Sequence, residues 1–577
     1  MNKWFKRLLV FSLIVVIGLG AAYLAVQKDK PPVKQVFINA NVLTMNSTNA
    51  IVQAIAVEND TIVAVGTNQE IKQLIDEDTV VHQLAGKTLL PGFVDAHSHF
   101  PGIGTGTLTV DLNSPPIGVI ESIEDIIIRL TEKLSTIKEG KWLIGVGYDD
   151  SLLKENRHVN RDDLDRISTT VPILLMHVSG HVVAINSLGL ELADLEIAGK
   201  DQKVIDPKGG RFVRDNAGRL TGVIEETARF DALALAFDLS FFDFIGMVEQ
   251  GAQEYAAVGV TTAQSGLSQE GQIKGLNIID KLGLIPQRLV IWPDMDTGKR
   301  WLSGEFSDAS YNSDNVTIGA VKLVADGSIQ AYTGFLSAPY HKHATGHGEQ
   351  SKSDYKGYPS MDQQQLEQMI VDLHQKGIQV AVHANGDAAI EMVINAVEKA
   401  QAVAPRPDAR HIMIHSQMAT TNQLERMKEW GITPSFFSSH TYYWGDRHRD
   451  IFMGPERSQR ISPAKSAADI GLLFSIHLDT PVVPMNPLFA VWSAVNRITS
   501  SGQELGPNER IDVMQALRSV TIDAAWQMFL EKQTGSLEVG KKADLVILAE
   551  NPLLQPTTLD KIDVLATYVA GLNIYSK

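Results

Sequence analysis

The chain has 577 residues, 44% hydrophobic and 20% charged, a composition ordinary for a globular protein of several domains, which excludes a disordered chain. Acidic residues outnumber basic ones, 67 to 51, and the formal net charge of −16 argues against a nucleic-acid partner, whose phosphates require basic patches. Because the chain has no cysteine, disulfides, thiolate metal ligands, a cysteine nucleophile and a lipoprotein anchor are all excluded.

The N-terminal segment differs from the rest of the chain. An uncharged apolar run extends from Leu8 to Val26, and basic residues flank it on both sides: Lys3, Lys6, Arg7, Lys28 and Lys30. As a helix this run spans about 28 Å, close to the ~30 Å hydrocarbon core of a bilayer. We therefore expect residues 1–33 to form a membrane anchor and linker, with the rest of the chain extracytoplasmic. The alternative is a cleaved signal segment and a secreted or periplasmic protein.

The two ends of the remaining chain have the pattern of short β-strands. The segments VFINANVLTM, AIVQAIAVEND and TIVAVGT alternate apolar and polar residues, and so do ADLVILAENP and VLATYVAGLNIY near the C-terminus. We expect residues 34–90 and 530–577 to form one small β-sandwich domain assembled from both chain ends.

The central part of the chain alternates strand-like and helix-like segments. Apolar runs such as AVKLVADG, IQVAVHANG, HIMIHS and LLFSIHLD are separated by amphipathic runs such as QQQLEQMIVDLHQKG. Alternating β and α units indicate a parallel sheet, and at this length a closed (β/α)8 TIM barrel over residues 91–529. Residues at about 111–240 are long and poorly periodic, which indicates an insertion. The predicted fold class is thus α/β, with a barrel, a β-sandwich and an N-terminal transmembrane anchor.

The first chemically informative segment is LLPGFVDAHSHF, which contains His97 and His99. Side chains two apart on a strand point to the same face, so both imidazoles can enter a barrel mouth together. Two imidazoles at a rigid strand end are suited to a divalent-metal site. A lone His-x-His pair is weak evidence, because either residue can be a hydrogen-bonded core histidine.

Four further polar residues end apolar, strand-like runs: Lys322, His383, His415 and Asp479. The carboxyl-terminal strand ends of a barrel converge on one mouth, where catalytic residues collect. A Lys or Asp within such a run is costly to bury without a partner or a metal. Any one of them can be a satisfied interior group, but their combination indicates a functional site.

The order of these residues resembles that of the amidohydrolase superfamily, in its amidohydrolase 3 branch. The resemblance covers nearly everything after the apolar run, in segments that include VPILLMHVSGHVVAINSLGL, VKLVADGS, VHANGDAAI, LDTPVVPMNPLFAVWSAVNR and GSLEVGKKADLVIL. Two positions depart from it. Ile414 precedes His415 where many relatives have Glu, and His477-Leu478-Asp479 stands where many have Gly-Ser-Asp. These changes affect the surroundings of the ligands rather than the ligands.

The resemblance implies a role for each candidate residue. His97 and His99 would bind one metal, and a carboxylated Lys322 would bridge to a second metal on His383 and His415. Asp479 would be both a ligand and the general base, and His181 would stabilise the oxyanion. The implied cofactor is one or two divalent ions, most simply Zn²⁺, which lowers the pKa of bound water to about 7. A single metal with unmodified Lys322 is the alternative.

Weaker candidates lie outside this set. We expect His440, Trp444 and His477 to line the substrate pocket, although the aromatic stretch around Tyr442 and Tyr443 can equally serve packing. His477 is alternatively expected to contact the metal ligands from behind. Other residues are predicted to lie on the surface: Glu225 and Glu226 at the exposed start of a helix, and His341, His343 and His347 in a loop.

Together these features predict an enzyme that hydrolyses a non-peptide, amide-like C–N bond of a small molecule with metal-activated water. The alternatives are hydrolysis of another bond (a lactone, a carbamate or an N-acetyl group) at the same site, or an exported regulatory or sensor protein with a vestigial site. The expected partners are the small-molecule substrate and the membrane, and a homo-oligomer is compatible with the sequence.

Overall fold

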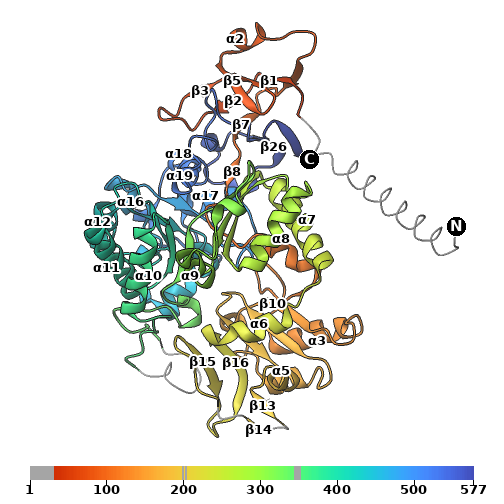
Figure 1. Ribbon diagram of the computed structural model, residues 1–577, viewed down its shortest axis with the longest axis vertical. Coiled ribbons are helices and arrows are strands. Elements are labelled where there is room, and N and C mark those ends of the chain that lie inside the picture. Colours follow the sequence, from red (N-terminus) through yellow and green to blue (C-terminus); the bar gives the residue numbers. More distant parts are fainter. Residues whose placement is uncertain (1–30, 198–199, 202–203, 343–352) are drawn as a thin grey trace, which may run out of the picture.

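The computed structural model describes residues 31–197, 200–201, 204–342 and 353–577. Three regions follow one another along the long axis of the molecule (Figure 1). Strands from both chain ends lie at one end, parallel strands surrounded by helices lie in the middle, and most of residues 111–240, here called the inserted segment, lie at the other end.

The chain-end region consists of two sheets, with strand orders β5-β4-β1-β6 and β27-β26-β25-β7-β2-β3. Its elements are β1 (Lys34–Ile38), β2 (Asn41–Leu43), β3 (Ile51–Val52), β4 (Ala54–Glu58), β5 (Thr61–Gly66), α2 (Asn68–Lys72), β6 (Val80–Gln83), β7 (Thr88–Pro91), β25 (Leu545–Leu548), β26 (Val564–Val569) and β27 (Leu572–Ser576). Strand β7 pairs with β25, with Leu89 opposite Ile547, so the two chain ends share one sheet. Apolar side chains of both sheets, including Phe37 and Tyr568, form a common core.

The middle region contains two parallel sheets, with strand orders β19-β18-β17-β8 and β20-β21-β22-β23-β24. Their bounds are β8 (Phe93–Val94), β17 (Val260–Ser268), β18 (Arg288–Pro293), β19 (Val316–Ile318), β20 (Val321–Val324), β21 (Val380–Ala384), β22 (His411–His415), β23 (Ile432–Phe436) and β24 (Ser475–Ile476). Every pairing in them is parallel, so the strands of each sheet end at the same edge.

The two parallel sheets meet at both edges. At one edge β19 leads into β20 through Gly319 and Ala320, so the sheets are joined by the chain itself. At the other edge Asp479 N donates to His97 O, and His99 N donates to Thr480 O. The predicted closed barrel is therefore present as two parallel sheets rather than as one hydrogen-bonded sheet that closes on itself. At the edge between β8 and β24 both strands are only two residues long, which leaves little backbone to pair.

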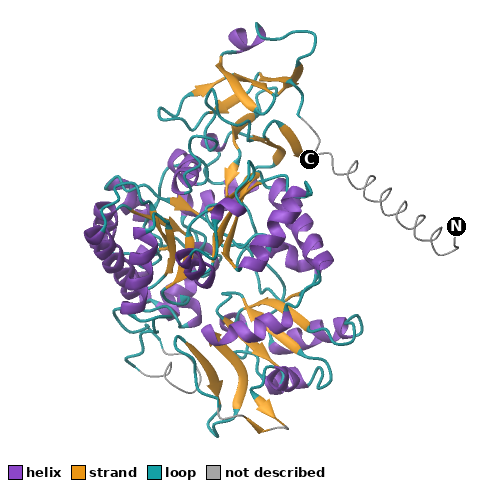
Figure 2. Ribbon diagram, viewed as in Figure 1, coloured by secondary structure: helices purple, strands orange, loops and turns teal. Residues whose placement is uncertain are grey.

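Helices cover the outside of the parallel sheets (Figure 2). The helices of the middle region are α7 (Phe241–Ala257), α8 (Glu270–Lys281), α9 (Met295–Ser303), α10 (Gln363–Gln375), α11 (Asp387–Val403), α12 (Thr421–Trp430), α13 (His440–Tyr443), α14 (Gly445–Arg447), α15 (Gly454–Arg457), α16 (Ala464–Asp469), α17 (Pro487–Asn496), α18 (Val513–Ser519) and α19 (Ile522–Gln527). In α10, Leu366, Ile370 and Leu373 lie on the buried face at helical spacing, and Asp362 caps the first turn by accepting from Gln365 N.

The inserted segment contains a six-stranded mixed sheet of order β15-β16-β12-β11-β10-β9. Its elements are β9 (Val110–Asp111), α3 (Ile123–Leu134), β10 (Leu143–Tyr148), α4 (Arg161–Asp165), β11 (Ile173–His177), β12 (Val182–Ile185), α5 (Ser187–Leu192), β13 (Glu196–Ile197), β14 (Lys200–Asp201), β15 (Gly210–Arg214), β16 (Leu220–Glu226) and α6 (Phe230–Ala236). Apolar side chains pack on both faces of this sheet, Leu130 and Leu175 on one and Leu174 and Ile224 on the other. The segment therefore has an apolar core of its own.

The predicted fold class requires a correction. In the described part of the chain no helix is both long enough and apolar enough to cross a bilayer. The longest helices in that part, α7 and α11, have 17 residues each and carry charged side chains on their outer faces. The predicted anchor, Leu8 to Val26, lies outside the described residues. The structure is a mixed α/β fold in which a membrane anchor has no support, and neither membrane association nor a homo-oligomer is supported by the described residues.

Candidate metal centre and active site

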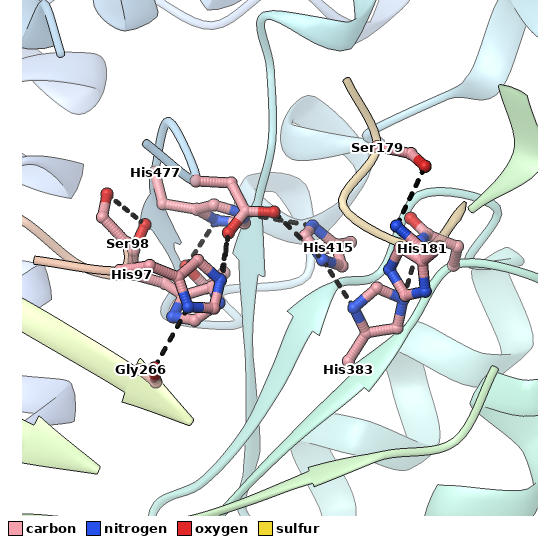
Figure 3. A network of polar contacts seen from close by, with 12 residues as sticks. His97, Ser98, Ser179, His181, Gly266, His383, His415 and His477 are labelled. Carbon is pink, nitrogen blue, oxygen red and sulfur yellow. Dashed lines mark hydrogen bonds and ion pairs between the residues drawn. The ribbon is translucent and has the colours of Figure 1, made fainter. Parts of the chain in front are cut away.

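Six of the side chains singled out in the sequence come together at the carboxyl ends of the parallel strands. Figure 3 shows three of them, His97, His383 and His415. Of the six, two follow β8, one each lies in β20, β21 and β22, and one follows β24: His97, His99, Lys322, His383, His415 and Asp479. They meet because parallel strands end at the same edge of a sheet. His415 and Asp479 have φ angles of 70° and 56°, in the left-handed region that is uncommon for non-glycine residues.

One half of the cluster consists of His97, His99 and Asp479. The Nε2 atoms of His97 and His99 lie 3.4 and 3.2 Å from Asp479 Oδ1. Their Nδ1 atoms face acceptors, Gln264 Oε1 at 3.1 Å and Gly266 O at 3.0 Å. A neutral imidazole has one proton, so protonated Nδ1 atoms leave two Nε2 lone pairs directed at a carboxylate.

The other half of the cluster is a row of histidines. His383 Nδ1 lies 3.0 Å from His415 Nε2, and His415 Nδ1 lies 3.1 Å from His477 Nε2. His415 Nε2 is also 3.8 Å from Asp479 Oδ2. Asp479 therefore lies between the two halves and has one carboxylate oxygen directed at each.

Lys322 is buried between these groups. It is 2% exposed, and its Nζ lies 2.9 Å from His97 Nε2. Burial lowers the pKa of Lys322 to about 7, although the charge of Asp479 opposes the shift. Burial also holds the pKa values of His97, His383 and His415 well below their usual range. The histidines are thus neutral near pH 7, the form that binds metal.

This donor set fits a divalent cation. Asp479 Oδ1 is buried and has no hydrogen-bond partner, although two imidazole nitrogens face it. Two groups in the cluster have ligand atoms within 4.8 Å of one another: His97, His99 and Asp479, and His415, His477 and Asp479. Imidazole and carboxylate ligands suit Zn²⁺ and similar ions, and a cation between these atoms would satisfy the unpaired carboxylate oxygen.

His181 approaches the cluster from the inserted segment. Its Nδ1 lies 2.8 Å from Glu226 Oε2, and its ring centroid is 4.9 Å from that of His383. The prediction that Glu225 and Glu226 begin an exposed helix is wrong. Both are 2% exposed and end β16, because β16 pairs with β12 and β15 as far as these two residues. Glu225 instead pairs with Arg211 at 2.8 Å.

A cavity of about 330 Å³ lies between the strand ends and the inserted segment. The strand-end side is polar and includes His97, His99, Lys322, His383 and Asp479. The opposite side is mainly apolar and includes Val146, Met176, Val178, Phe230 and Leu233. The cavity therefore suits a small molecule with a polar reacting group and an apolar remainder.

The three residues predicted to line the pocket are not among those that line this cavity, and each is 2% exposed. His477 lies behind His415 and binds Ser435 Oγ through its other ring nitrogen. Trp444 donates its indole N–H to Asp149, and the ring of His440 packs on Phe437. The aromatic stretch faces the interior because its apolar rings pack there.

The remaining surface prediction concerns a loop. His341 is exposed, as expected, whereas His343 and His347 lie outside the described residues.

Sequence reasoning missed Gln264, which orients His97, and Arg229, which lines the cavity. It also missed Trp292, which stacks on the ring of His97 at 5.3 Å. The two consecutive acids that end the run TGVIEE were the one available signal for Glu226.

The fold and site together define a metal-dependent hydrolase of the amidohydrolase type. The model of the amidohydrolase family matches residues 81–575, and the chain belongs to that family. It is 27% identical over 552 residues to an N-substituted formamide deformylase of Arthrobacter pascens, which covers 94% of this chain and 98% of the relative.

Two other similarities are informative. An uncharacterized metal-dependent hydrolase from Pyrococcus horikoshii OT3 has a similar fold, with a TM-score of 0.71 and 23% identity over 90% of this chain and 98% of that one. The exoenzymes regulatory protein AepA of Pectobacterium carotovorum subsp. carotovorum is 25% identical over 66% of this chain and 80% of its own length.

Proposed function

We propose that this protein hydrolyses an amide-like C–N bond, other than a peptide bond, in a small molecule with an apolar substituent. The observation that carries the proposal is the convergence of four histidines, Lys322 and Asp479 on one side of a mainly apolar cavity. The similarity to an N-substituted formamide deformylase supports an amide or formamide as the scissile group.

The chain's own residues would hold the metal. His97, His99 and Asp479 would bind one ion, and His383, His415 and Lys322 would bind a second. When bound, a divalent ion such as Zn²⁺ supplies an activated water and polarises the scissile carbonyl. Lys322 contributes best as a carbamate: its neutral amine adds to the carbon of CO₂ and loses one proton, which leaves an anionic carboxylate. The low pKa of Lys322 supports this, because the neutral amine is available near pH 7.

Asp479 would move the proton. Its carboxylate lies beside the imidazole nitrogens of both halves of the cluster, where the attacking water must lie. It would take the proton of that water and deliver it to the leaving nitrogen, as a positioned general base and then acid. On the opposite side, Glu226 Oε2 lies 2.8 Å from His181 Nδ1 and holds the imidazole ring in place, and His181 would stabilise the developing oxyanion.

The test combines metal analysis with a substrate panel. Protein purified without chelator should contain divalent metal, and the double variant His97→Ala with His99→Ala should lose most of it. N-substituted formamides and N-acyl amines should be hydrolysed faster than matched esters, lactones and carbamates. Turnover of lactones or esters alone would replace the proposed bond by another one. A fully metallated wild type without turnover across the panel would contradict the enzyme function and favour a regulatory role.

A further inference from the structure

Arg229 lies on the apolar side of the cavity, at the point where β16 leads into α6. Among the residues that line the cavity in the described chain, it and Lys322 carry the only Arg or Lys side chains. Its Nη1 donates to the backbone carbonyl of Glu226 at 2.7 Å, and its guanidinium carbon lies 4.6 Å above the ring of Phe230. These contacts hold the guanidinium against the cavity wall.

The charge of Arg229 has no carboxylate partner within ion-pairing distance in the described part of the chain. Its Nε is buried and makes no hydrogen bond. The carboxylate of Glu226, three residues before it, contacts His181 instead, with Oε2 2.8 Å from His181 Nδ1. Other arginines that contact the inserted segment differ, since Arg211 pairs with Glu225 and Arg447 pairs with Asp149. A guanidinium partly withdrawn from water, as that of Arg229 is, gains from an anion that joins it.

We propose that Arg229 binds a carboxylate of the substrate, so that the site acts on amides of the N-acyl or N-formyl amino-acid type. This inference rests on the proposed function. A planar guanidinium matches a carboxylate through two parallel hydrogen bonds. Met176, Phe230 and Leu233 lie on the same wall and provide an apolar surface for a hydrophobic side chain of such a substrate. The amide then lies at the strand ends and the carboxylate at the inserted segment.

The experiment compares two substrates that differ in one group. N-formylphenylalanine and N-phenethylformamide share the formamide and the aromatic part, and only the first has a carboxylate. Wild-type holoenzyme should prefer N-formylphenylalanine in kcat/KM by about tenfold or more, and Arg229→Met should lower that value by about 10²-fold, as expected for one charge-assisted pair. Its turnover of N-phenethylformamide should change less than about threefold, and Arg229→Lys should be intermediate.

The matched control is Arg211→Met, which removes a guanidinium of the same segment that does not line the cavity. Melting temperatures of all variants establish that they fold. A wild type that prefers the uncharged compound, or an Arg229→Met variant that loses both activities equally, would overturn the inference. If neither compound is hydrolysed, the proposed function fails separately. Calorimetry with the same two compounds then still decides, because equal affinities of wild type and Arg229→Met for N-formylphenylalanine contradict a carboxylate site.

Discussion

The two walls of the cavity are built in different ways. The strand-end wall consists of imidazole, amine and carboxylate groups on parallel strands whose neighbours hold their orientation, such as Gln264 and Gly266. The wall from the inserted segment is apolar and comes from turns and a short helix at the edge of a separate mixed sheet. Its polar side chains are those of Asn113, His177, Ser179, His181 and Arg229, and Glu226 contacts His181 from behind this wall. The difference indicates that the core positions the chemistry and the inserted segment selects the substrate.

The largest effect should come from the strand-end wall. Asp479→Asn keeps the shape of the side chain but cannot accept a proton, so kcat should fall about 10²–10⁴-fold. Metal content must be measured in the same sample, because Asp479 also faces the ligand nitrogens. Asp296→Asn, at an exposed position, is the control. An Asp479→Asn enzyme with full metal and wild-type turnover would contradict the role of the strand-end wall.

A smaller loss of activity is expected when the pair of His181 and Glu226, which lies where the two walls meet, is disrupted. Glu226→Gln removes the negative charge beside His181 Nδ1, and kcat should fall about 10- to 100-fold with little change in KM, as for other groups that orient a catalytic residue. Glu225→Gln is a close control, because the adjacent side chain points to the opposite face of β16 and pairs with Arg211. Equal losses in the two variants would mean that Glu226 acts through the stability of the sheet.

The apolar wall should affect binding more than chemistry. Leu233→Ala enlarges the cavity and should raise KM for an apolar substrate about tenfold, which corresponds to about 1.4 kcal/mol of lost apolar contact. Trp444→Phe should leave KM nearly unchanged, because Trp444 does not line the cavity, although loss of its hydrogen bond to Asp149 should lower the melting temperature. A raised KM with an unchanged melting temperature would instead show that Trp444 lines the pocket.

The last prediction concerns stability rather than activity, in chelator-treated protein. The pKa of Lys322 is about 7 in the folded chain and 10.5 in the reference state, so between these values the unfolded chain binds more protons and stability rises with pH. Lys322→Met has no such dependence. The melting temperature of Lys322→Met should therefore exceed that of the wild type by the largest amount at or below about pH 7, and the difference should decline toward pH 10. A difference that does not vary with pH would show that Lys322 is not deprotonated by burial.

Much of the strand-end wall could be predicted because its signals are local. Apolar runs that end in His, Lys or Asp predict strands with polar carboxyl ends. Parallel pairing then places Lys322, His383 and His415 at one edge of the sheet, independently of the conformation of the loops. The His-x-His spacing likewise places His97 and His99 together, because side chains two apart share a face.

The inserted segment could not be predicted in the same way. Its sheet pairs β10 with β11 in parallel but β12 with β16 antiparallel, so its strands have no common direction that would gather polar residues at one edge. For this reason the sequence wrongly predicted Glu226 at the exposed start of a helix. No periodic pattern of residues indicated that Arg229 lines the cavity. His440 and Trp444 were misplaced for a related reason: an aromatic run is equally compatible with a pocket and with interior packing.

The sequence by itself determined the residue types available for chemistry, the absence of thiol ligands, and the strand ends at which the imidazoles and carboxylate lie. Only the tertiary structure decided that the barrel strands form two sheets, that Glu226 orients His181, and that an unpaired Arg229 faces the same cavity as Asp479. The physical reason is distance along the chain. Strand ends follow from contacts between neighbours in sequence, whereas the walls of a cavity depend on side chains brought together from segments hundreds of residues apart.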